Sequence, residues 1–580
     1  MKNPLLRALI YVKPYWKIAL LSTVMLSVSV VIELQIPKLM QRIVDEGIRN
    51  ADLGLISVTA LTMIVLAFLD TGLSIGNTAL SVRAAQSFAA DLRDAVFRQI
   101  QRFSFGNLDR FQTGELIIRL TSDVNAVQQV VMMGLRMFIR APLMITGSII
   151  MMYIVNAELA RIILIIMPFI FVVAGIFVWK GQPLFLKMQA KLDRLNSVLQ
   201  ENLAGVRVVK AFVRQKYEED RFGNANVDLR NQATSVFRLM SFLMPFLFAF
   251  VNFGVLAVLY YGGQLVIQGR FTIGEILSFS NYLLSSMFPL LFISMIASQA
   301  SSAVASASRI YQVLDFEPMV QDMLGAKSID DVTGRVVFED VSFKYNGGEG
   351  EPVLKNMSFA AEPGQIVALL GATGSGKSTL IDLIPRFYDV TGGRISIDGV
   401  DIREMTINSL RSHIGIALQE PILFSGTIRD NIKYGRPEAT DDEVIAAAKA
   451  AQAHDFIMNS PKGYDTDVGQ RGAGLSGGQK QRISIARAIL VRPKILILDD
   501  STSSVDVKTE TLIQEALENV MQNRTSFIIA QRISSVLKAD KILVLERGNI
   551  VAEGQHQELM QTSEIYREIY NSQLGGGIRE

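Results

Sequence analysis

A glycine-rich loop followed by a lysine and a serine is the part of this sequence with the clearest chemistry. The pattern is Gly371-x4-Gly376-Lys377-Ser378, and it directly follows an apolar run that ends at Leu370. Glycines let backbone N–H groups converge on phosphate oxygens, the lysine reaches the β- and γ-phosphates, and the serine hydroxyl binds Mg²⁺. The sequence therefore predicts a site for ATP and Mg²⁺. The loop residues predicted to contact the nucleotide are Gly371, Thr373, Gly374, Ser375, Gly376, Lys377, Ser378 and Thr379.

Two further motifs fit the same chemistry. The apolar run at 495–498 ends in Asp499, whose carboxylate suits the metal, either directly or through water. The signature run LSGGQ at 475–479 places glycines just ahead of a helix that we expect to begin near Lys480. N–H donors at the positive end of a helix can close over a γ-phosphate.

The elements that must position these motifs belong to a soluble α/β region. Apolar runs typical of strands alternate with helical patterns such as the one at 443–453. The strand-like runs lie at 367–370, 495–498 and 527–530. Before this region, from about 317 to 333, acidic and turn residues replace the apolar periodicity, which indicates a linker.

The first half of the chain is predicted to cross a membrane. The 580 residues are 49% hydrophobic with a mean hydropathy of +0.30, which is high for a soluble protein. Six stretches reach the roughly 20 apolar residues that a spanning helix needs. They lie at 18–37, 55–82, 137–156, 159–179, 243–267 and 272–298. The two long connections between spans are rich in Arg and Lys, so the positive-inside rule places them, and with them both termini, in the cytoplasm.

The predicted fold class is an all-α transmembrane domain of six helices followed by an α/β P-loop nucleotide-binding domain. We place the transmembrane domain at 1–315, the linker at 316–333 and the nucleotide-binding domain at 334–580. The formal net charge of only +2 argues against a nucleic-acid partner. Because the chain has no cysteine, disulfide scaffolding and thiolate metal sites are excluded, and this composition suits a protein of the bacterial inner membrane.

These motifs, in this order, resemble those of ATP-binding-cassette (ABC) transporters, and the resemblance covers nearly the whole chain. The chain is similar to a half-transporter of the multidrug and lipid exporter type, which has the type I exporter fold, also called type IV. The resemblance implies two cassettes in a head-to-tail sandwich. Each ATP then lies between one chain's phosphate loop and the other chain's signature run, so the lipid bilayer and a second half-transporter are the implied partners.

Further site residues follow from this resemblance. Tyr345 matches the aromatic residue that stacks on adenine, although it could be an ordinary strand aromatic. Gln419 matches the Q-loop residue, which is implied to hold Mg²⁺ together with Ser378 and Asp499. The D-loop at 503–506 includes Asp506. The residues implied to contact the opposite ATP are Ser476, Gly477, Gly478 and Gln479. The regions at 106–123 and 211–222 resemble the two coupling-helix regions.

Three departures from the family pattern distinguish this chain. Asp500 stands in place of the usual catalytic glutamate, Gln531 in place of the usual switch histidine, and Gln470 where related exporters usually have glutamate. With the phosphate loop and signature run intact, these changes indicate a cassette that binds ATP better than it hydrolyses it. They favour the degenerate-site subunit of a heterodimer whose partner carries the intact catalytic site. The alternative is neutral drift in a slow homodimer.

Polar groups inside the predicted spans are candidates for substrate contact. Charged residues are costly in a bilayer, so we expect Glu33 and Asp70 to face a water-filled cavity or each other, as contacts for cationic cargo or as packing hydrogen bonds. Arg140 is expected to snorkel to the cytoplasmic boundary. Abundant Met and Phe in the spans suit apolar ligands, or else lipid-facing packing.

The sequence thus predicts ATP-driven export of drugs or other amphipathic molecules across the inner (cytoplasmic) membrane. The alternatives are a homodimeric lipid or drug flippase, a regulatory subunit gated by ATP, and a siderophore importer with the exporter fold.

Overall fold

The structure is a computed structural model, and its chain forms two compact units. It describes residues 3–345, 350–499, 520–521, 523–529, 533 and 536–574, apart from the side chains at 162–171, 173–174, 178, 243–244, 247 and 287–298. Unit 1 comprises Met1–Ile100 and Gly114–Phe316, and unit 2 comprises Gln101–Thr113 and Glu317–Glu580. Residues 101–113, here named the inserted segment, therefore pack in unit 2 although their neighbours in the sequence on both sides belong to unit 1.

Unit 1 consists of helices, several of which are far longer than the roughly 20 residues that span a bilayer. α3 has 49 residues, α8 has 48 and α10 has 53. The elements, including the 3-10 turn η1 and the π-helical turns η2 to η4, are α1 (Pro4–Ala8), η1 (Leu9–Tyr15), α2 (Trp16–Arg42), η2 (Ile43–Ile48), α3 (Leu53–Gln101), α5 (Thr113–Ile118), η3 (Arg119–Asp123), α6 (Val124–Met133), η4 (Gly134–Phe138), α7 (Ile139–Val155), α8 (Ala157–Ala204), α9 (Val206–Ala211), α10 (Gln215–Ile267) and α11 (Ile273–Leu314).

Side-chain hydrogen bonds fix where two of the long helices begin. Asn156 Oδ1 accepts hydrogen bonds from the backbone N–H groups of Glu158 at 2.9 Å and Leu159 at 3.0 Å. This cap starts α8, and Asn156 is the one residue between α7 and α8. At α11, the Glu275 N–H donates to Thr272 Oγ1 at 3.1 Å and the Thr272 N–H donates to Glu275 Oε2 at 2.7 Å. This reciprocal capping box closes the short turn between α10 and α11.

The six predicted spans coincide with these helices, apart from Asn156 and Thr272, which lie just outside a helix end. In the part of the chain whose side chains are described, four helical stretches are long and apolar enough to cross a membrane. They are Pro4–Ile48, Leu53–Gln101, Thr113–Val155 and Phe248–Ile267. The spans predicted at 159–179 and 272–298 fall in α8 and α11 and include side chains outside the described set.

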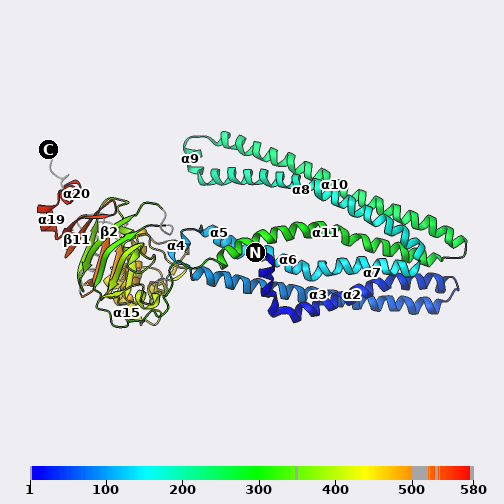
Figure 1. Cartoon of the computed structure of the whole chain (residues 1–580), viewed down its shortest axis with the longest axis horizontal. Helices are drawn as coiled ribbons and strands as arrows, with labels where there is room; N and C mark the ends of the chain where they lie inside the picture. Colours follow the sequence, from blue (N-terminus) through cyan, green and yellow to red (C-terminus); the bar gives the residue numbers. More distant parts are fainter. Residues whose placement is uncertain are drawn as a thin grey trace. The chain divides into compact units, whose positions relative to one another are not determined.

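Helix packing in unit 1 follows the apolar faces. α8 and α10 lie side by side along their length and are joined through α9 (Figure 1). A buried apolar cluster draws on α2, α7, α10 and α11 and includes Leu34, Met144, Val258 and Phe279. Within it, the hydroxyl of Tyr282 donates to the Leu34 carbonyl at 2.8 Å, so this buried phenol is paired.

Unit 2 contains two main sheets. The six-stranded sheet has the order β12-β11-β3-β10-β9-β6 and the four-stranded sheet the order β2-β1-β4-β5. The six-stranded sheet is parallel except for β12, and the four-stranded sheet is antiparallel. The strands are β1 (Val336–Phe343), β2 (Leu354–Ala361), β3 (Ile366–Leu370), β4 (Gly392–Ile397), β5 (Val400–Asp401), β6 (Ile414–Ala417), β7 (Gly426–Thr427), β8 (Asp467–Val468), β9 (Ile495–Asp499), β10 (Thr525–Ile529), β11 (Lys541–Glu546) and β12 (Asn549–Gly554).

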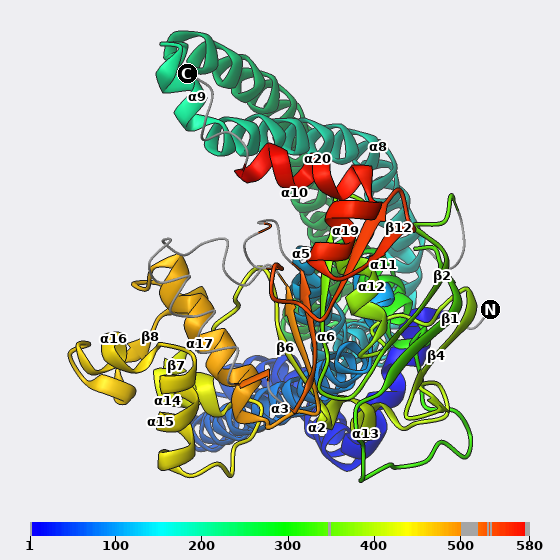
Figure 2. The same cartoon turned by 90° about the vertical axis from the view of Figure 1, so that its left-hand side faces the viewer.

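Helices accompany these strands, and Figure 2 shows α14 to α17 gathered beside them. The helices of unit 2 are α4 (Phe105–Leu108), α12 (Lys377–Leu383), α13 (Ile407–Ser412), α14 (Ile428–Lys433), α15 (Asp441–Ala450), α16 (His454–Met458), η5 (Gly463–Asp465), η6 (Gln470–Gly472), α17 (Gly477–Leu490), α19 (His556–Thr562) and α20 (Glu564–Leu574). The predicted fold class, a helical domain followed by an α/β P-loop domain, is confirmed.

The parallel sheet positions the site. β9 is buried at all five positions, as expected for a parallel strand that is covered on both faces. β3, β10, β9 and β6 are neighbours that run in the same direction, so their carboxyl ends meet at one edge. The loop after β3, the last residue of β9 and the segment after β6 therefore emerge together.

Candidate functional site

The glycine-rich loop forms a tight cradle at the carboxyl edge of the parallel sheet. We name residues 371–379 the phosphate loop. Gly371 and Gly376 have φ values of 153° and 103°, which favour glycine. A Cβ on Gly371 would lie 2.2 Å from the Leu545 carbonyl oxygen, and one on Gly376 would lie 2.7 Å from Leu354 Cδ2. The backbone can follow this path only because both positions are glycine.

A cavity of about 400 Å³ opens over the phosphate loop. It is lined by Val353, Gly371, Ala372, Thr373, Gly374, Gly376, Lys377, Ser378, Thr379, Gln419, Asp499 and Ile529. The structure thus brings Gln419 and Asp499 together with most of the predicted loop residues. Val353 and Ile529 are apolar lining residues that the sequence motifs did not include.

The donor set of this cavity fits the triphosphate of ATP. Lys377 Nζ donates to the carbonyl oxygens of Gly371 at 2.8 Å and Ala372 at 2.9 Å, so its positive charge lies over the loop. Ser375 Oγ is buried and has no hydrogen-bond partner among the described residues. A cation, a glycine cradle and the carboxylate of Asp499 in one cavity are the groups that bind a nucleotide phosphate and its counterion.

Asp382 does not line the cavity, but it lies close enough to Asp499 to feel its charge, and the sequence motifs missed it. Burial raises its pKa, and the negative charges of Asp499 and Asp109 add to this effect, so that the pKa reaches about 7. Ser378 and Asp382 are four residues apart on α12, so they share one face of the helix. The available signal was an acidic residue set among the apolar residues Leu380, Ile381 and Leu383.

Tyr345 lies beside the phosphate loop but not among the residues that line the cavity. Its hydroxyl is hydrogen-bonded to Thr379 Oγ1 at 2.9 Å. Its ring meets that of Tyr388 edge-on, with centroids 5.3 Å apart. Contact with adenine therefore remains a prediction for this residue.

The signature run does not line the same cavity. Ser476 and Gln479 form a capping box on α17, in which the Ser476 N–H donates to Gln479 Oε1 at 2.9 Å and the Gln479 N–H donates to Ser476 Oγ at 3.3 Å. The helix consequently begins at Gly477, earlier than the predicted start near Lys480. Gly477 and Gly478 occupy its first turn.

Three predicted site residues lie outside the described residues: Asp500, Asp506 and Gln531. The hypotheses of a slow site and of a D-loop at 503–506 therefore rest on the sequence alone.

A second cavity, of about 490 Å³, lies among the helices of unit 1. Glu33 lines it and accepts a hydrogen bond from Arg140 Nη2 at 2.7 Å, and the position of Arg140 at the membrane boundary stays a prediction. Asp70 is not a lining residue and accepts a hydrogen bond from the Ser29 hydroxyl. The lining residues are Leu26, Glu33, Ser74, Asn77, Thr78, Arg136, Met137, Arg140, Ala141, Met144, Asn281, Leu284 and Ser285.

Comparison with known proteins agrees with both units. Residues 19–290 match the family described as ABC transporter transmembrane region, and residues 354–503 match the family described as ABC transporter. The chain is 40% identical over 574 residues to an uncharacterized ABC transporter ATP-binding protein, YfiB, of Bacillus subtilis (strain 168), covering 98% of each chain. It is 36% identical over 526 residues to an ATP-dependent lipid A-core flippase of Syntrophus aciditrophicus (strain SB), covering 91% of this chain and 87% of that protein.

A solved structure extends the comparison to three dimensions. The structure of a bacterial Atm1-family ABC exporter with ATP bound matches with a TM-score of 0.81 at 27% identity, covering 98% of this chain and 99% of that one. The chain belongs to the ABC transporter family, as an exporter half-transporter whose ATPase is coupled to transport.

Proposed function

We propose that this chain exports amphipathic molecules across the cytoplasmic (inner) membrane as one half of a heterodimer. The separation of two motifs within one chain supports a dimer, and the pairing with a different subunit is proposed from Asp500 and Gln531 in the sequence. The phosphate loop, Gln419 and Asp499 share a cavity that the signature run does not line. A complete site then needs the signature run of a second half-transporter, and this chain's run serves the partner's ATP.

The phosphate loop is proposed to hold ATP with Mg²⁺. Ser378, Gln419 and Asp499 would hold the metal, which supplies positive charge to the β- and γ-phosphates. Lys377 holds a second positive charge over the same phosphates, and Tyr345 would move from its contact with Thr379 to stack on adenine. These roles need only short side-chain movements around a fixed loop.

The chain's own ATP site is proposed to be the slower of the two. Asp500 keeps the negative charge of the usual glutamate but is one methylene shorter, and a displacement of about 1 Å can cost on the order of 10²-fold in rate. Gln531 can donate a hydrogen bond to a phosphate but cannot carry a proton. Both changes leave the binding groups of the phosphate loop intact.

The substrate class is proposed from the cavity of unit 1. Met137, Met144 and Leu284 line it together with Arg136, Arg140 and Glu33, so its lining is both apolar and charged. Such a lining suits an amphipathic molecule. The relative named as a lipid A-core flippase supports a lipid-like cargo.

Purified protein tests the proposal. The chain alone should bind Mg-ATP through Lys377 and turn it over slowly, whereas the chain with its partner should hydrolyse ATP at a rate typical of enzymes, about 1 s⁻¹ or more. Lys377→Ala should remove binding and serve as the control. Robust hydrolysis by a verified homodimer of this chain would instead support a homodimeric flippase.

A further inference from the structure

The cavity of unit 1 carries an excess of positive charge. It has a volume of about 490 Å³ and is lined by residues of α2, α3, η4, α7 and α11 (Figure 1). Arg136 and Arg140 line it together with one carboxylate, that of Glu33. A charged group in a membrane-spanning helix bundle is costly unless an opposite charge lies near it. Among the described lining residues, one arginine is therefore left without a carboxylate of its own.

The two arginines differ in their partners. Arg140 Nη2 donates to Glu33 Oε2 at 2.7 Å, so the negative charge of Glu33 is matched. Arg136 has an exposed side chain and makes no hydrogen bond or ion pair with any residue whose side chain the structure describes. Asp70 does not line the cavity and accepts a hydrogen bond from the Ser29 hydroxyl. The guanidinium of Arg136 therefore offers its donors to an anion that the described residues do not supply.

Neutral donors surround the same space. Ser74 and Thr78 lie four residues apart on α3, as Asn281 and Ser285 do on α11, so each pair shares one face of its helix. Hydroxyl and amide groups donate to phosphate and carboxylate oxygens, and these hydrogen bonds are stronger when the acceptor is charged. A guanidinium together with such donors suits an anionic head.

Apolar side chains complete the lining. Met137 and Met144 line the cavity with Leu26 of α2 and Leu284 of α11. Methionine is flexible, so it adapts to apolar chains of different shape. The cavity therefore offers contacts for a charged head and for an apolar tail.

We propose that the cavity binds an amphiphile through its anionic head, a phosphate or a carboxylate, and that Arg136 is the residue that holds this head. The inference rests on the proposed export of amphipathic molecules and names the charge of the cargo. Arg140 stays paired with Glu33 and offers its remaining N–H groups to the same head. A cationic head would have to displace Arg140 from Glu33 and leave both arginines without a carboxylate, so it is the less stable occupant.

Three variants separate the charge of the cavity from its packing. Arg136→Gln removes a positive charge from an exposed side chain. Glu33→Gln removes the competing carboxylate and frees Arg140 for the head. Arg83→Gln is the matched control, because Arg83 is exposed on α3 and does not line the cavity. A role in packing alone would not give effects of opposite sign that depend on the charge of the ligand.

Equilibrium binding to the full chain in phosphatidylcholine nanodiscs, without nucleotide, tests the proposal. The probes have apolar chains of equal length and differ in the head. They are dodecyl phosphate, N-dodecanoylglycine, neutral dodecanoylglycerol and cationic dodecyltrimethylammonium. Nanodiscs without protein correct for partitioning into the lipid.

The two anionic probes should bind the wild type more tightly than the neutral and cationic probes. Arg136→Gln should weaken the binding of both anions about tenfold, because a hydrogen-bonded charge is lost, and leave the neutral probe unchanged. Glu33→Gln should tighten the binding of both anions about fivefold, and Arg83→Gln should change neither. The anion that binds more tightly identifies the head as a phosphate or a carboxylate, and either order supports the proposal.

Three results would overturn the proposal: equal affinities for all four probes, an equal loss of the neutral and anionic probes in Arg136→Gln, or a preference for the cationic probe that Glu33→Gln abolishes. Because the assay uses neither ATP nor a second subunit, a failure of ATP-driven export would leave the binding result unchanged. Export of amphiphiles together with equal affinities for the four probes would keep the proposed function and reject this inference.

Discussion

Asp382 is buried in unit 2 and should make its stability depend on pH. Its pKa is raised from 3.8 to about 7 by burial and by the charges of Asp499 and Asp109. Between those two values the folded chain holds a proton that the unfolded chain has lost. The contribution of Asp382 to stability is therefore fully present below pH 4 and is lost as the pH rises through 7.

Asp382→Asn should remove this dependence. At pH 8, in EDTA and without nucleotide, the variant should unfold at a higher temperature than the wild type, because a buried carboxylate is replaced by a neutral amide. At pH 5.5 the folded carboxyl is mostly protonated, so the difference between the two proteins should be smaller than at pH 8. Thermal unfolding of the full chain at both pH values provides the measurement, and an equal shift at both would show that Asp382 is not the titrating group.

Glu33 and Arg140 should behave as a pair. Their side chains are 36% and 40% exposed, so the pair is partly solvated and its coupling energy should be about 1 kcal/mol. Glu33→Gln and Arg140→Gln should each lower the unfolding temperature, and the double variant should recover part of the loss. If Glu33 contacts cationic cargo instead, Glu33→Gln alone should lower transport of cations more than that of neutral compounds.

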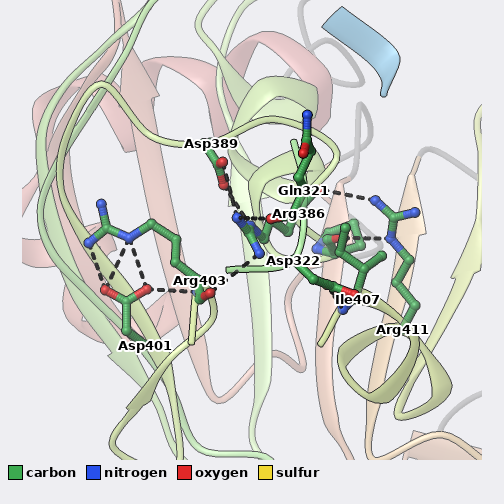
Figure 3. A network of polar contacts seen from close by, with 9 residues as sticks. Gln321, Asp322, Arg386, Asp389, Asp401, Arg403, Ile407 and Arg411 are labelled. Carbon is green, nitrogen blue, oxygen red and sulfur yellow. Dashed lines mark hydrogen bonds and ion pairs between the residues drawn. The ribbon is translucent and has the colours of Figure 1, made fainter. Parts of the chain in front are cut away.

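At the scale of elements, the turn after α12 depends on one buried arginine. Arg386→Met would leave Asp389 and the Gln321 carbonyl without their donor (Figure 3), and breaking a buried ion pair typically costs about 3 kcal/mol or more. Arg394→Met removes a matched but exposed pair with Glu339, worth about 1 kcal/mol at most. Thermal unfolding of the two variants should therefore show a much larger drop for Arg386→Met, and equal drops would contradict the structural role of the turn.

Elements with strong local signals were predictable. The glycines of the phosphate loop and the apolar run before it fix a strand, a tight loop and a helix within a few residues. The strand-like run at 495–498 corresponds to β9, which ends in Asp499. The start of α17 was misplaced because the reciprocal hydrogen bonds of Ser476 and Gln479 were not recognised as a helix cap.

Contacts between distant segments were not predictable in this way. Tyr388 and Asp109 are 279 positions apart, and no periodic pattern relates them. For the same reason the inserted segment was assigned to the first domain by its place in the sequence, although it packs in unit 2. Asp382 had a local signal, but its raised pKa depends on carboxylates that only the fold brings near.

At the scale of the whole molecule, the motifs of one chain are proposed to serve two different ATP molecules. In the assembled pair, Gly477→Glu would place a side chain and a negative charge against the partner's γ-phosphate, so most hydrolysis should be lost. Asp500→Ala changes the slow site and should leave much of the hydrolysis intact. Steady-state ATPase of each variant, with dimer content checked by size exclusion, provides the measurement. Equal damage from both changes would show that this chain's own site does the hydrolysing.

The length of α3 has a mechanical consequence. Its 49 residues extend about 74 Å at 1.5 Å per residue, against a hydrocarbon layer of about 30 Å. The helix is continuous to Gln101, the first residue of the inserted segment. A rigid rod of that length acts as a lever, so a tilt of about 5° at one end displaces the other by about 6 Å. A small change in the tilt of α3 at one end is therefore magnified into a displacement of its other end.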